Sequence, residues 1–424
     1  NIPEIGEYKM AVNLASPGIL VREVDLTIGN VDPTSGSIGA LVAPFTKGPV
    51  EEPQLIENEE DLLQTFGQPY SIDNHYEYWM VASSYLSYGG TMQVIRANDA
   101  GLKNATEDGA PELLIKSDTH YNQLGYDDNT ITGTVIAAKT PGSYANGIRV
   151  SIIDGKADQI ITTTGISTVG MGVTQSVANR VVAGAAGTSL LDGYLKGIVT
   201  GIPETGKVEV KVLSHVSAAG TVTNVDYQAN GVYCFKANEI LSASLAGTNV
   251  SAATTSVVST QIDWFEQQEI VLTTKDGNGN PIKLEWDSLA DAPGTSSYAQ
   301  ARGGRHDELH VIVIDDKGTI TGNAGTILEK HLNLSKATDA EYSVGSTSYW
   351  RKYLANVSQY IYGGSAPAGI TTTGFDGATA TAIGTLDGDN GWDQPADSAD
   401  KGFGVIGVFT SSLTGGKNYG GKTD

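Results

Sequence analysis

Near the N-terminus, the pattern of apolar and polar positions predicts a strand, two helices and a second strand. Residues 36–50, GSIGALVAPFTKGPV, form a short apolar run that ends at Gly48 and Pro49, a combination typical of a strand followed by a turn. Residues 91–99, TMQVIRAND, indicate another strand. Between these two strands the apolar residues follow a different period.

Two stretches between the strands have helical spacing. The first, residues 58–66, begins with Asn58 as a helix cap, carries acidic residues in its first turn and stops at Gly67. The second, residues 73–88, ends at Gly89. Strand, helix, helix and strand in this order predict an α/β layer.

The middle of the chain is dominated by alternating patterns. Residues 155–285 have almost no helical periodicity, which predicts an all-β insertion, and KDGNGNP within them is typical of a hairpin turn. Further on, the patterns predict a turn and strand in residues 141–153, a strand in 307–321 and a short helix in 325–340. They also predict an amphipathic helix in 345–364 and a last buried strand in 401–424.

A further strand-like run, LASPGILVREVDL, occupies residues 14–26. Pro17 and Gly18 begin it, and both of its faces are half apolar, with Ile19, Val21, Glu23 and Asp25 on one face and Leu20, Arg22, Val24 and Leu26 on the other. Neither face suits solvent. The run therefore needs a partner that is not obvious in its own chain.

Charge and composition exclude several classes of protein. The net charge is −22 with only 26 scattered Lys and Arg residues, which argues against a nucleic-acid binder and against docking on anionic membrane. No apolar run reaches the length of a membrane span, and no secretory signal is recognisable. One cysteine excludes an internal disulfide framework, and Cys234 lies in an apolar run where a buried small side chain is expected.

Candidate chemical motifs all fall short of their patterns. HDELH places His306 and His310 four apart but has Asp307 where a zinc protease needs Glu, and the apolar run after it favours a strand. DGDNGWD, residues 387–393, lacks calcium-loop spacing, and ARGGR, residues 301–305, lacks the Lys and Ser or Thr of a phosphate loop. We expect no enzyme activity, no metal and no cofactor.

Aromatic side chains at helical spacing have two possible interpretations. They would form either an exposed recognition patch or part of the core, and the core is the expected one because helices mostly bury such a stripe. The residues concerned are Tyr76, Trp79, Tyr349, Trp350 and Tyr353.

Taken in order, several stretches resemble a known family. SPGILVREVD, GSIGALVAPFTKGPVEEPQLIENEEDLLQTFGQP and ASSYLSYGGTMQVIRA are similar to the N-terminal part of tail sheath proteins of contractile-tailed bacteriophages, especially T-even-like myoviruses. Two later stretches, PGSYANGIRVSI and ILEKHLNLSKATDA with GSTSYWRKYLANVSQYI, agree with later segments of that family. The residues that carry the family's core motif here are Lys47, Gly48, Pro49, Phe66, Gly67, Gly89 and Arg96.

The resemblance implies a structural subunit. Such a protein has an α+β multidomain fold, in which antiparallel β-rich protruding domains are inserted into a discontinuous α/β core. Identical subunits polymerise helically around a tail tube and contract to drive it through the host envelope. The tube, baseplate and tail terminator proteins are the implied partners, with neither nucleic acid nor a membrane anchor, and the implied place is the virion, after assembly in host cytoplasm. An inter-subunit arm would comprise residues 17–26.

The resemblance also implies domain limits. We expect an arm in residues 1–32, the first part of the core in 33–97 and a β-rich linker that begins the insertion in 98–154. A protruding β-rich region is expected in 155–340 and a second part of the core in 341–424. The family continues beyond the position of Asp424, so the second part of the core is expected to be incomplete. Without that continuation both parts would lack some of their sheet.

Other classes of protein remain open at this point. A β-rich surface adhesin would share the acidic, Gly-rich composition but would usually carry an export signal. A hydrolase on a β scaffold would need a convergent set of acid, base or metal ligands, which the motifs do not supply. A bacteriocin or injection-system sheath would differ from a phage sheath only in context.

Overall fold

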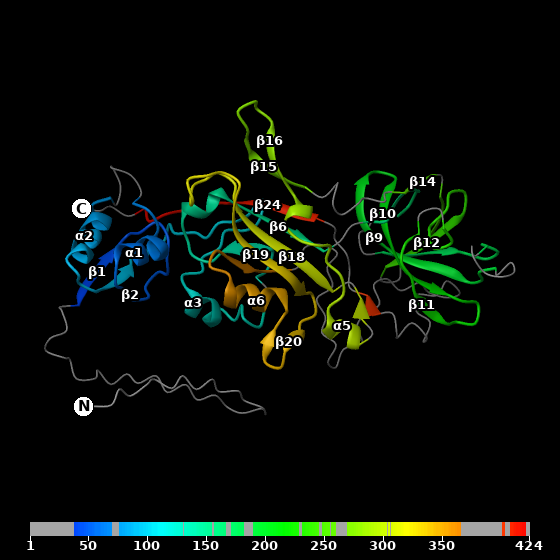
Figure 1. Ribbon diagram of the computed structural model, residues 1–424, viewed down its shortest axis with the longest axis horizontal. Coiled ribbons are helices and arrows are strands. Elements are labelled where there is room, and N and C mark those ends of the chain that lie inside the picture. Colours follow the sequence, from blue (N-terminus) through cyan, green and yellow to red (C-terminus); the bar gives the residue numbers. More distant parts are fainter. Residues whose placement is uncertain are drawn as a thin grey trace, which may run out of the picture.

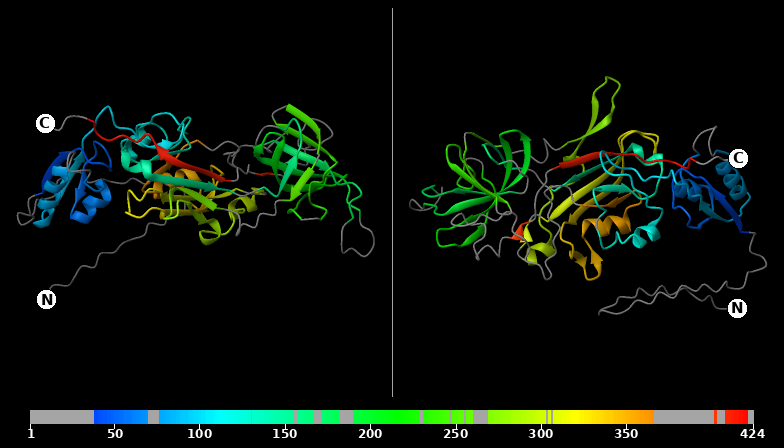
Figure 2. Two further views of the ribbon diagram at one scale, coloured as in Figure 1. Left: turned by 90° about the horizontal axis from the view of Figure 1, so that it is seen from above. Right: turned by 180° about the vertical axis from the view of Figure 1, so that it is seen from behind.

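In a computed structural model, the chain forms three lobes in a row along its long axis (Figures 1 and 2). We call them the N-terminal lobe, the central lobe and the insertion, which comprise the described residues within 38–97, within 98–154 and 269–420, and within 157–259. The structure describes residues 38–69, 76–129, 131–154, 157–166, 171–181, 190–228, 231–245, 248–254, 256–259, 269–302, 304–305, 307–365, 401–402 and 408–420.

The N-terminal lobe is the predicted α/β layer. A three-stranded sheet has the order β1-β3-β2, with β1 parallel to β3 and β2 antiparallel to it. Its elements are β1 (Gly39–Ala43), β2 (Gln54–Ile56), α1 (Glu59–Phe66), α2 (Tyr76–Ser87) and β3 (Met92–Arg96). The pattern missed β2, because only three residues within an acidic stretch form it.

One face of this sheet carries both helices. Phe66 of α1 and Trp79 of α2 pack with Met92 and Val94 of β3 in one buried cluster. The N-terminus of α1 has the predicted cap, since the Asn58 side-chain oxygen accepts the Asp61 amide at 2.8 Å.

The central lobe is built on a seven-stranded sheet in which every described pair is antiparallel, in the order β19-β18-β6-β24-β4-β5-β22. The strands are β4 (Thr106–Glu107), β5 (Ile136–Ala138), β6 (Ile148–Ile153), β18 (Glu308–Asp315), β19 (Thr326–Ser335), β22 (Ile361–Gly363) and β24 (Val408–Thr414). Short helices cover it: α3 (Asp118–Gln123), η1 (Ser143–Gly147) and α6 (Trp350–Val357).

The helix predicted in residues 325–340 is wrong, because most of that segment is the strand β19. Leu328 and Leu334 pack into the main core of the central lobe, whereas Ile327 and Leu332 pack into a second cluster. A strand that buries both faces has apolar residues without strict alternation, and such a run imitates a helical period. The neighbouring strand β18 decides the conformation by pairing along it.

The insertion is entirely β-structure among its described residues, as predicted. Its sheet runs β13-β12-β8-β9-β10-β7-β14, with β11 also paired to β10. The strands are β7 (Gln159–Thr162), β8 (Gly172–Ser176), β9 (Tyr194–Glu204), β10 (Lys207–Val216), β11 (Val222–Asn224), β12 (Ile240–Leu245), β13 (Thr248–Ala253) and β14 (Ser256–Ser259). Cys234 is buried in it, as expected.

The predicted hairpin is present but belongs to the central lobe. Its strands β15 (Glu269–Lys275) and β16 (Pro281–Glu285) project from that lobe in Figure 1. At their base Ile270 packs in one cluster with Trp286 and Ile312. The remaining small elements are η2 (Trp286–Ser288), α5 (Ser297–Ala301), β17 (Gly304–Arg305), β20 (Glu341–Ser343), β21 (Ser346–Thr347) and β23 (Lys401–Gly402).

The sheets group the segments differently from the expected domain limits. Strands β1 to β3 form a sheet of their own, whereas β4 to β6, β18 and β19 share the central sheet with β22 and β24 from residues 341–424. The reason is β6, which pairs with β18 on one side and with β24 on the other. The domain limits themselves stay a prediction.

The aromatic residues at helical spacing are mainly core. Trp350 is fully buried, Tyr349 and Trp79 nearly so, and Tyr76 is exposed. The expectation of a core stripe is therefore confirmed for both tryptophans.

Asn58→Ala should lower the free energy of unfolding by about 1 kcal/mol, because the Asp61 amide at the start of α1 loses its acceptor. Urea denaturation followed by circular dichroism measures this. The exposed substitution Gln64→Ala on the same helix is the control and should have less effect. Equal effects of the two substitutions would contradict the capping role.

Candidate functional site

Most of the core-motif residues meet where the N-terminal lobe joins the central lobe. We call this strip the seam, and it comprises residues 46–50, Phe66, Gly67 and Arg96 with the facing Lys116, Thr140 and Gly142. Arg96 is fully buried at the end of β3. Its guanidinium donates from Nη1 to the Gly48 carbonyl at 2.8 Å and from Nη2 to the Thr46 carbonyl at 3.3 Å.

The charge of Arg96 is retained despite its burial. Loss of solvation lowers its pKa to about 10, which leaves it protonated at neutral pH. A buried cation is stable only where acceptors surround it, so the turn after β1 must present its carbonyls to β3. Sequence reasoning singled out Arg96 only through the family resemblance, since nothing in its local pattern indicates burial.

Two glycines allow the chain to approach itself closely in the seam. Gly48 has φ +97°, and a Cβ there would lie 2.7 Å from the Thr65 carbonyl. Gly67 has φ +78°, and a Cβ there would lie 2.9 Å from Thr46 Oγ1. Both positions therefore exclude larger residues for two independent reasons.

The same turn fastens the N-terminal lobe to the central lobe. The Gly48 amide donates to Thr140 Oγ1 at 3.3 Å, and the Val50 amide donates to the Lys116 carbonyl at 2.9 Å. A Cβ on Gly142 would lie 2.3 Å from the Thr46 carbonyl, so the two backbones are in close contact. Of the central-lobe residues here, the sequence pointed only to Gly142, through the resemblance of PGSYANGIRVSI; Lys116 and Thr140 did not stand out.

Lys47 reaches across the seam. Its Nζ donates to the Gln64 carbonyl at 3.1 Å and lies 4.8 Å from the centre of the Tyr360 ring. Burial lowers the pKa of Lys47, and the charge of Glu329 in the central lobe opposes that change. Pro49 lines an open groove beside Lys47. Gly89 lies apart from the seam, at the end of α2 with φ +81°.

The other face of the N-terminal sheet exposes apolar side chains. Val42 is 64% exposed, Ile38 62% and Leu55 51%. Val42 and Leu55 are paired in register with Ile95 and Gln93, which point away from the helix-covered side. We call Ile38, Val42 and Leu55 the apolar face. It adjoins β1, an edge strand among the described residues.

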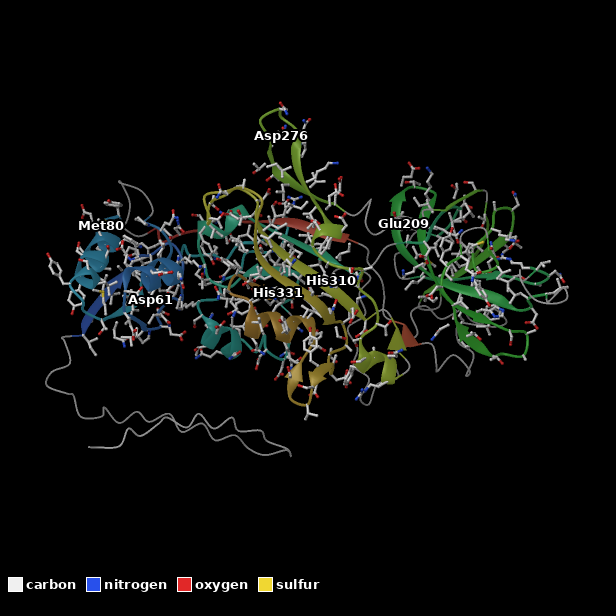
Figure 3. All side chains as sticks on the ribbon, viewed as in Figure 1. Asp61, Met80, Glu209, Asp276, His310 and His331 are labelled. Carbon is white, nitrogen blue, oxygen red and sulfur yellow. The ribbon has the colours of Figure 1, made fainter. Side chains whose placement is uncertain are left out.

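Two of the candidate chemical motifs can be placed in part. His310 lies on β18 (Figure 3), where Nε2 is 2.8 Å from the Asp291 carbonyl and Nδ1 accepts the Asn333 amide at 3.0 Å. Its two ring nitrogens therefore bind backbone, and burial lowers its pKa. In ARGGR, the Arg302 guanidinium stacks 3.5 Å from the centre of the Tyr298 ring.

The rest of these motifs cannot be placed. His306, residues 387–393 and the arm of residues 17–26 lie outside the described residues, as does the side chain of Arg305. In the part of the chain that the structure describes, no group of three or more His, Cys, Asp or Glu side chains is arranged to hold a metal. No helix described there is long and apolar enough to cross a membrane.

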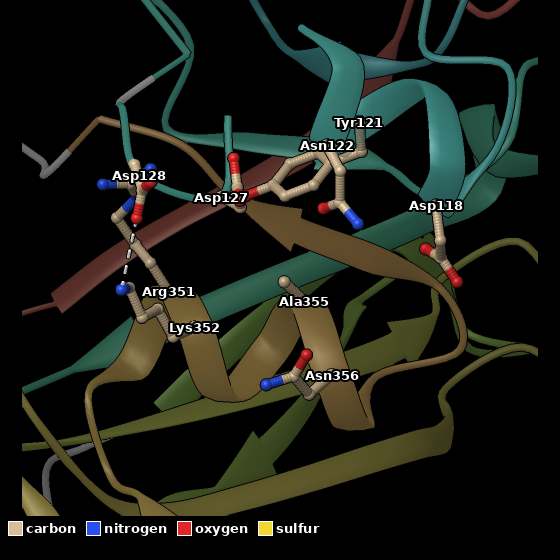
Figure 4. Close-up of a pocket in the computed structure, with 9 residues that line it drawn as sticks. All are labelled: Asp118, Tyr121, Asn122, Asp127, Asp128, Arg351, Lys352, Ala355 and Asn356. Atoms are coloured by element: carbon tan, nitrogen blue, oxygen red, sulfur yellow. Dashed lines mark ion pairs between the residues drawn. The ribbon is translucent and has the colours of Figure 1, made fainter. Parts of the chain in front are cut away.

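A polar groove of about 290 Å³ lies between α3 and α6 (Figure 4). Lys352 pairs with Asp128 at 3.5 Å on one side of it. Arg351 donates to the Tyr126 carbonyl at 3.2 Å and to that of Asn129. These side chains tie α6 to the loop after α3, and the lining includes neither His nor Cys.

Comparison with known proteins supports one family. No family model matches the chain. The tail sheath protein of Enterobacteria phage T4 is 36% identical over 88 residues, which are 21% of this chain and 13% of that protein. The predicted resemblance to a phage tail sheath protein is confirmed over that stretch. The chain thus spans about an eighth of the length of the curated relative that it matches.

A solved structure was also found. The sheath tail protein Lin1278 from Listeria innocua is 16% identical to this chain, and the match covers 54% of this chain and 37% of that one with a TM-score of 0.17. A TM-score this low supports no argument about the fold.

Gly48→Ala should destabilise the protein by about 3 kcal/mol, because backbone strain adds to a clash with the Thr65 carbonyl. Gly89→Ala is the matched control: its φ is also positive, but a Cβ there meets nothing within 4 Å, so strain of about 1 kcal/mol alone is expected. Thermal unfolding of both variants makes the comparison. Equal losses of stability would refute close packing in the seam.

The stability of the central lobe should depend on Glu329 at acid pH. Burial acts to raise the pKa of Glu329, but hydrogen bonds from His331, Ser358 and Gln359 outweigh it and lower that pKa. A lowered pKa in the folded protein stabilises it above about pH 4.3, the unfolded value, and this stabilisation disappears as the pH falls through the folded value.

Glu329→Gln should therefore be less stable than the unchanged protein at pH 7, with a difference in unfolding free energy that shrinks below about pH 4.3. Urea titrations from pH 7 to pH 3 measure this difference. Glu341→Gln, at an exposed position on β20, serves as the control. A difference that stays constant with pH would contradict the assignment.

Proposed function

We propose that the chain is a structural subunit of a contractile phage tail sheath, which polymerises helically around the tail tube and contracts to drive it through the host envelope. The observation that carries the proposal is the apolar face beside the edge strand β1, on the lobe that contains the core motif. Exposed apolar side chains beside an unpaired strand edge are the features that a self-assembling β-protein needs. The likeness to the T4 tail sheath protein supports it.

Strand addition is the proposed contact between subunits. The arm, residues 17–26, has two half-apolar faces and therefore suits a strand that is covered on both sides. Paired along β1 of a neighbouring subunit, it would place apolar side chains beside Val42, whereas Leu55 lies on β2 at the opposite edge of the sheet. Each backbone hydrogen bond contributes about 0.5 to 1.5 kcal/mol net, and the side-chain pattern sets the register.

One such contact is weak, but a helical lattice repeats it. Heterologous contacts that do not close generate open helices, and many ties hold subunits together while rigid bodies rotate. The seam supports this role, because backbone hydrogen bonds and close-packed glycines join the N-terminal lobe to the central lobe. Force applied to the lattice through β1 would thus reach the central sheet.

Contraction then requires no catalysis. An extended lattice trapped at assembly would relax to one that buries more complementary surface, with the energy stored by assembly and no nucleotide consumed. In this proposal the protein is not an enzyme. Its partners are identical subunits, the tube protein, and the baseplate and terminator proteins at the two ends of the tail.

Val42→Asp in the full native polypeptide should abolish ordered tubes in negative-stain electron micrographs, because it places a charge on the apolar face. Deletion of residues 10–30 should do the same by removing the arm. Val344→Asp is the matched control: Val344 is 95% exposed between β20 and β21, far from β1 in the chain, and tubes should persist.

Circular dichroism and thermal unfolding of each variant should match those of the unchanged protein. This control distinguishes a loss of assembly from a loss of folding. Tubes of normal order from Val42→Asp would remove the role of the apolar face. Monodisperse particles from the unchanged polypeptide would argue against a sheath altogether.

A further inference from the structure

Three ionisable side chains gather at one end of three adjacent strands of the central sheet. Asp154 directly follows β6, Asp307 directly precedes β18, and Lys336 directly follows β19. Strand β18 lies between the other two and is antiparallel to both. The register pairs His310 with Ile153 and Glu308 with Ser335, which brings the three residues to the same edge of the sheet.

This group is closed to solvent. The side chains of Lys336 and Asp154 are both 0% exposed, and Lys336 Nζ lies 2.7 Å from Asp154 Oδ2. Leu309 and Leu334, the nearest apolar residues along β18 and β19, are also fully buried. Burial away from water raises the free energy of the charged forms of both side chains. The neutral amine and the neutral acid therefore come close in free energy to the ion pair. Burial lowers the pKa of Lys336, and the charge of Asp154 opposes that change.

Asp307 completes the group. It is fully buried, and its carboxylate accepts the Ser296 amide at 2.8 Å and the hydroxyls of Ser296 and Ser335. Its backbone carbonyl accepts the Lys336 amide at 2.8 Å, so the two residues are held side by side. The Asp307 carboxylate is also near enough for its negative charge to raise the pKa of Lys336, as that of Asp154 does.

We propose that Lys336 and Asp154 condense to an intramolecular amide bond between Nζ and Cγ. Neighbouring amine and carboxyl groups held in contact in a dry site react as one unit, without the loss of freedom that a bimolecular reaction requires. Nothing else at the site is needed as a reactant. The formation of this bond does not depend on assembly or contraction of a sheath.

The reaction balances with water as its only other product. One proton passes from the Lys336 ammonium to the Asp154 carboxylate, which gives a neutral amine and a neutral acid. The nitrogen lone pair then attacks Cγ, the bond from Cγ to its hydroxyl oxygen breaks, and a proton from nitrogen leaves with that hydroxyl as water. Asp307 is the group beside the amine that can relay this second proton.

The bond would reinforce the root of the insertion. Strand β6 leads into the insertion, and the chain returns to the central lobe before β15. A load on the insertion pulls on the end of β6, which backbone hydrogen bonds and apolar packing hold to β18. An amide from Asp154 to Lys336 would bypass those bonds and would also restrict the unfolded chain, as other long-range cross-links do.

Intact mass spectrometry of the denatured, purified chain tests the proposal. We expect most molecules to weigh one water less than the sequence requires, and tandem spectra of a digest should contain one branched peptide that carries both Asp154 and Lys336. A mass equal to that of the sequence overturns the proposal. So does a loss of water in linear peptides only, because Asp154 precedes Gly155 and can instead cyclise with it.

Substitutions test which residues form the cross-link and which residue relays the proton. Lys336→Met and Asp154→Ala should both restore the full mass, whereas Lys283→Arg, in the exposed ion pair with Glu269, should leave the cross-link intact. Asp307→Asn should slow the cross-linking of newly made chain, as followed by mass over time. Unchanged rates for Asp307→Asn would exclude it as the relay. The mass of the unchanged chain decides the main question even where a variant does not fold.

Discussion

The buried guanidinium of Arg96 is the interaction on which the placement of the N-terminal lobe depends. It binds the carbonyls of Thr46 and Gly48, and so fixes the turn after β1 against the end of β3. The same turn offers the amides of Gly48 and Val50 to the central lobe. Because a buried cation tolerates few alternative arrangements of its acceptors, one side chain determines both the shape of the turn and the surface that meets the next lobe.

Beyond the seam, the architecture follows from the way β6 is paired. Its two neighbours, β18 and β24, come from segments far away in the chain. The insertion begins after the C-terminal end of β6. The central sheet is therefore the junction between the lobe with the apolar face and the insertion. In a sheath subunit of the proposed kind, this sheet would carry force between the lattice contacts and the outer parts of the molecule.

Local signals predicted the N-terminal lobe well. Asn58 marks the start of α1 through its side-chain hydrogen bond to the Asp61 amide, and Gly67 marks the end through its positive φ; both are local effects that need no information from elsewhere in the chain. The β18 strand and the hairpin of β15 and β16 were predicted for the same reason. Prediction failed for β19, where the residues suit a helical period and only pairing with β18 selects a strand.

The sequence by itself determined the order of elements in the N-terminal lobe, the all-β character of the insertion and the family resemblance, because caps, turns and alternation are local properties. Tertiary structure decided which segments share a sheet, that Arg96 is buried against Thr46 and Gly48, and that Lys336 meets Asp154. Those contacts join residues far apart in the chain. They follow from strand pairing and burial, which depend on all of the partners at once and so leave no mark at any single position.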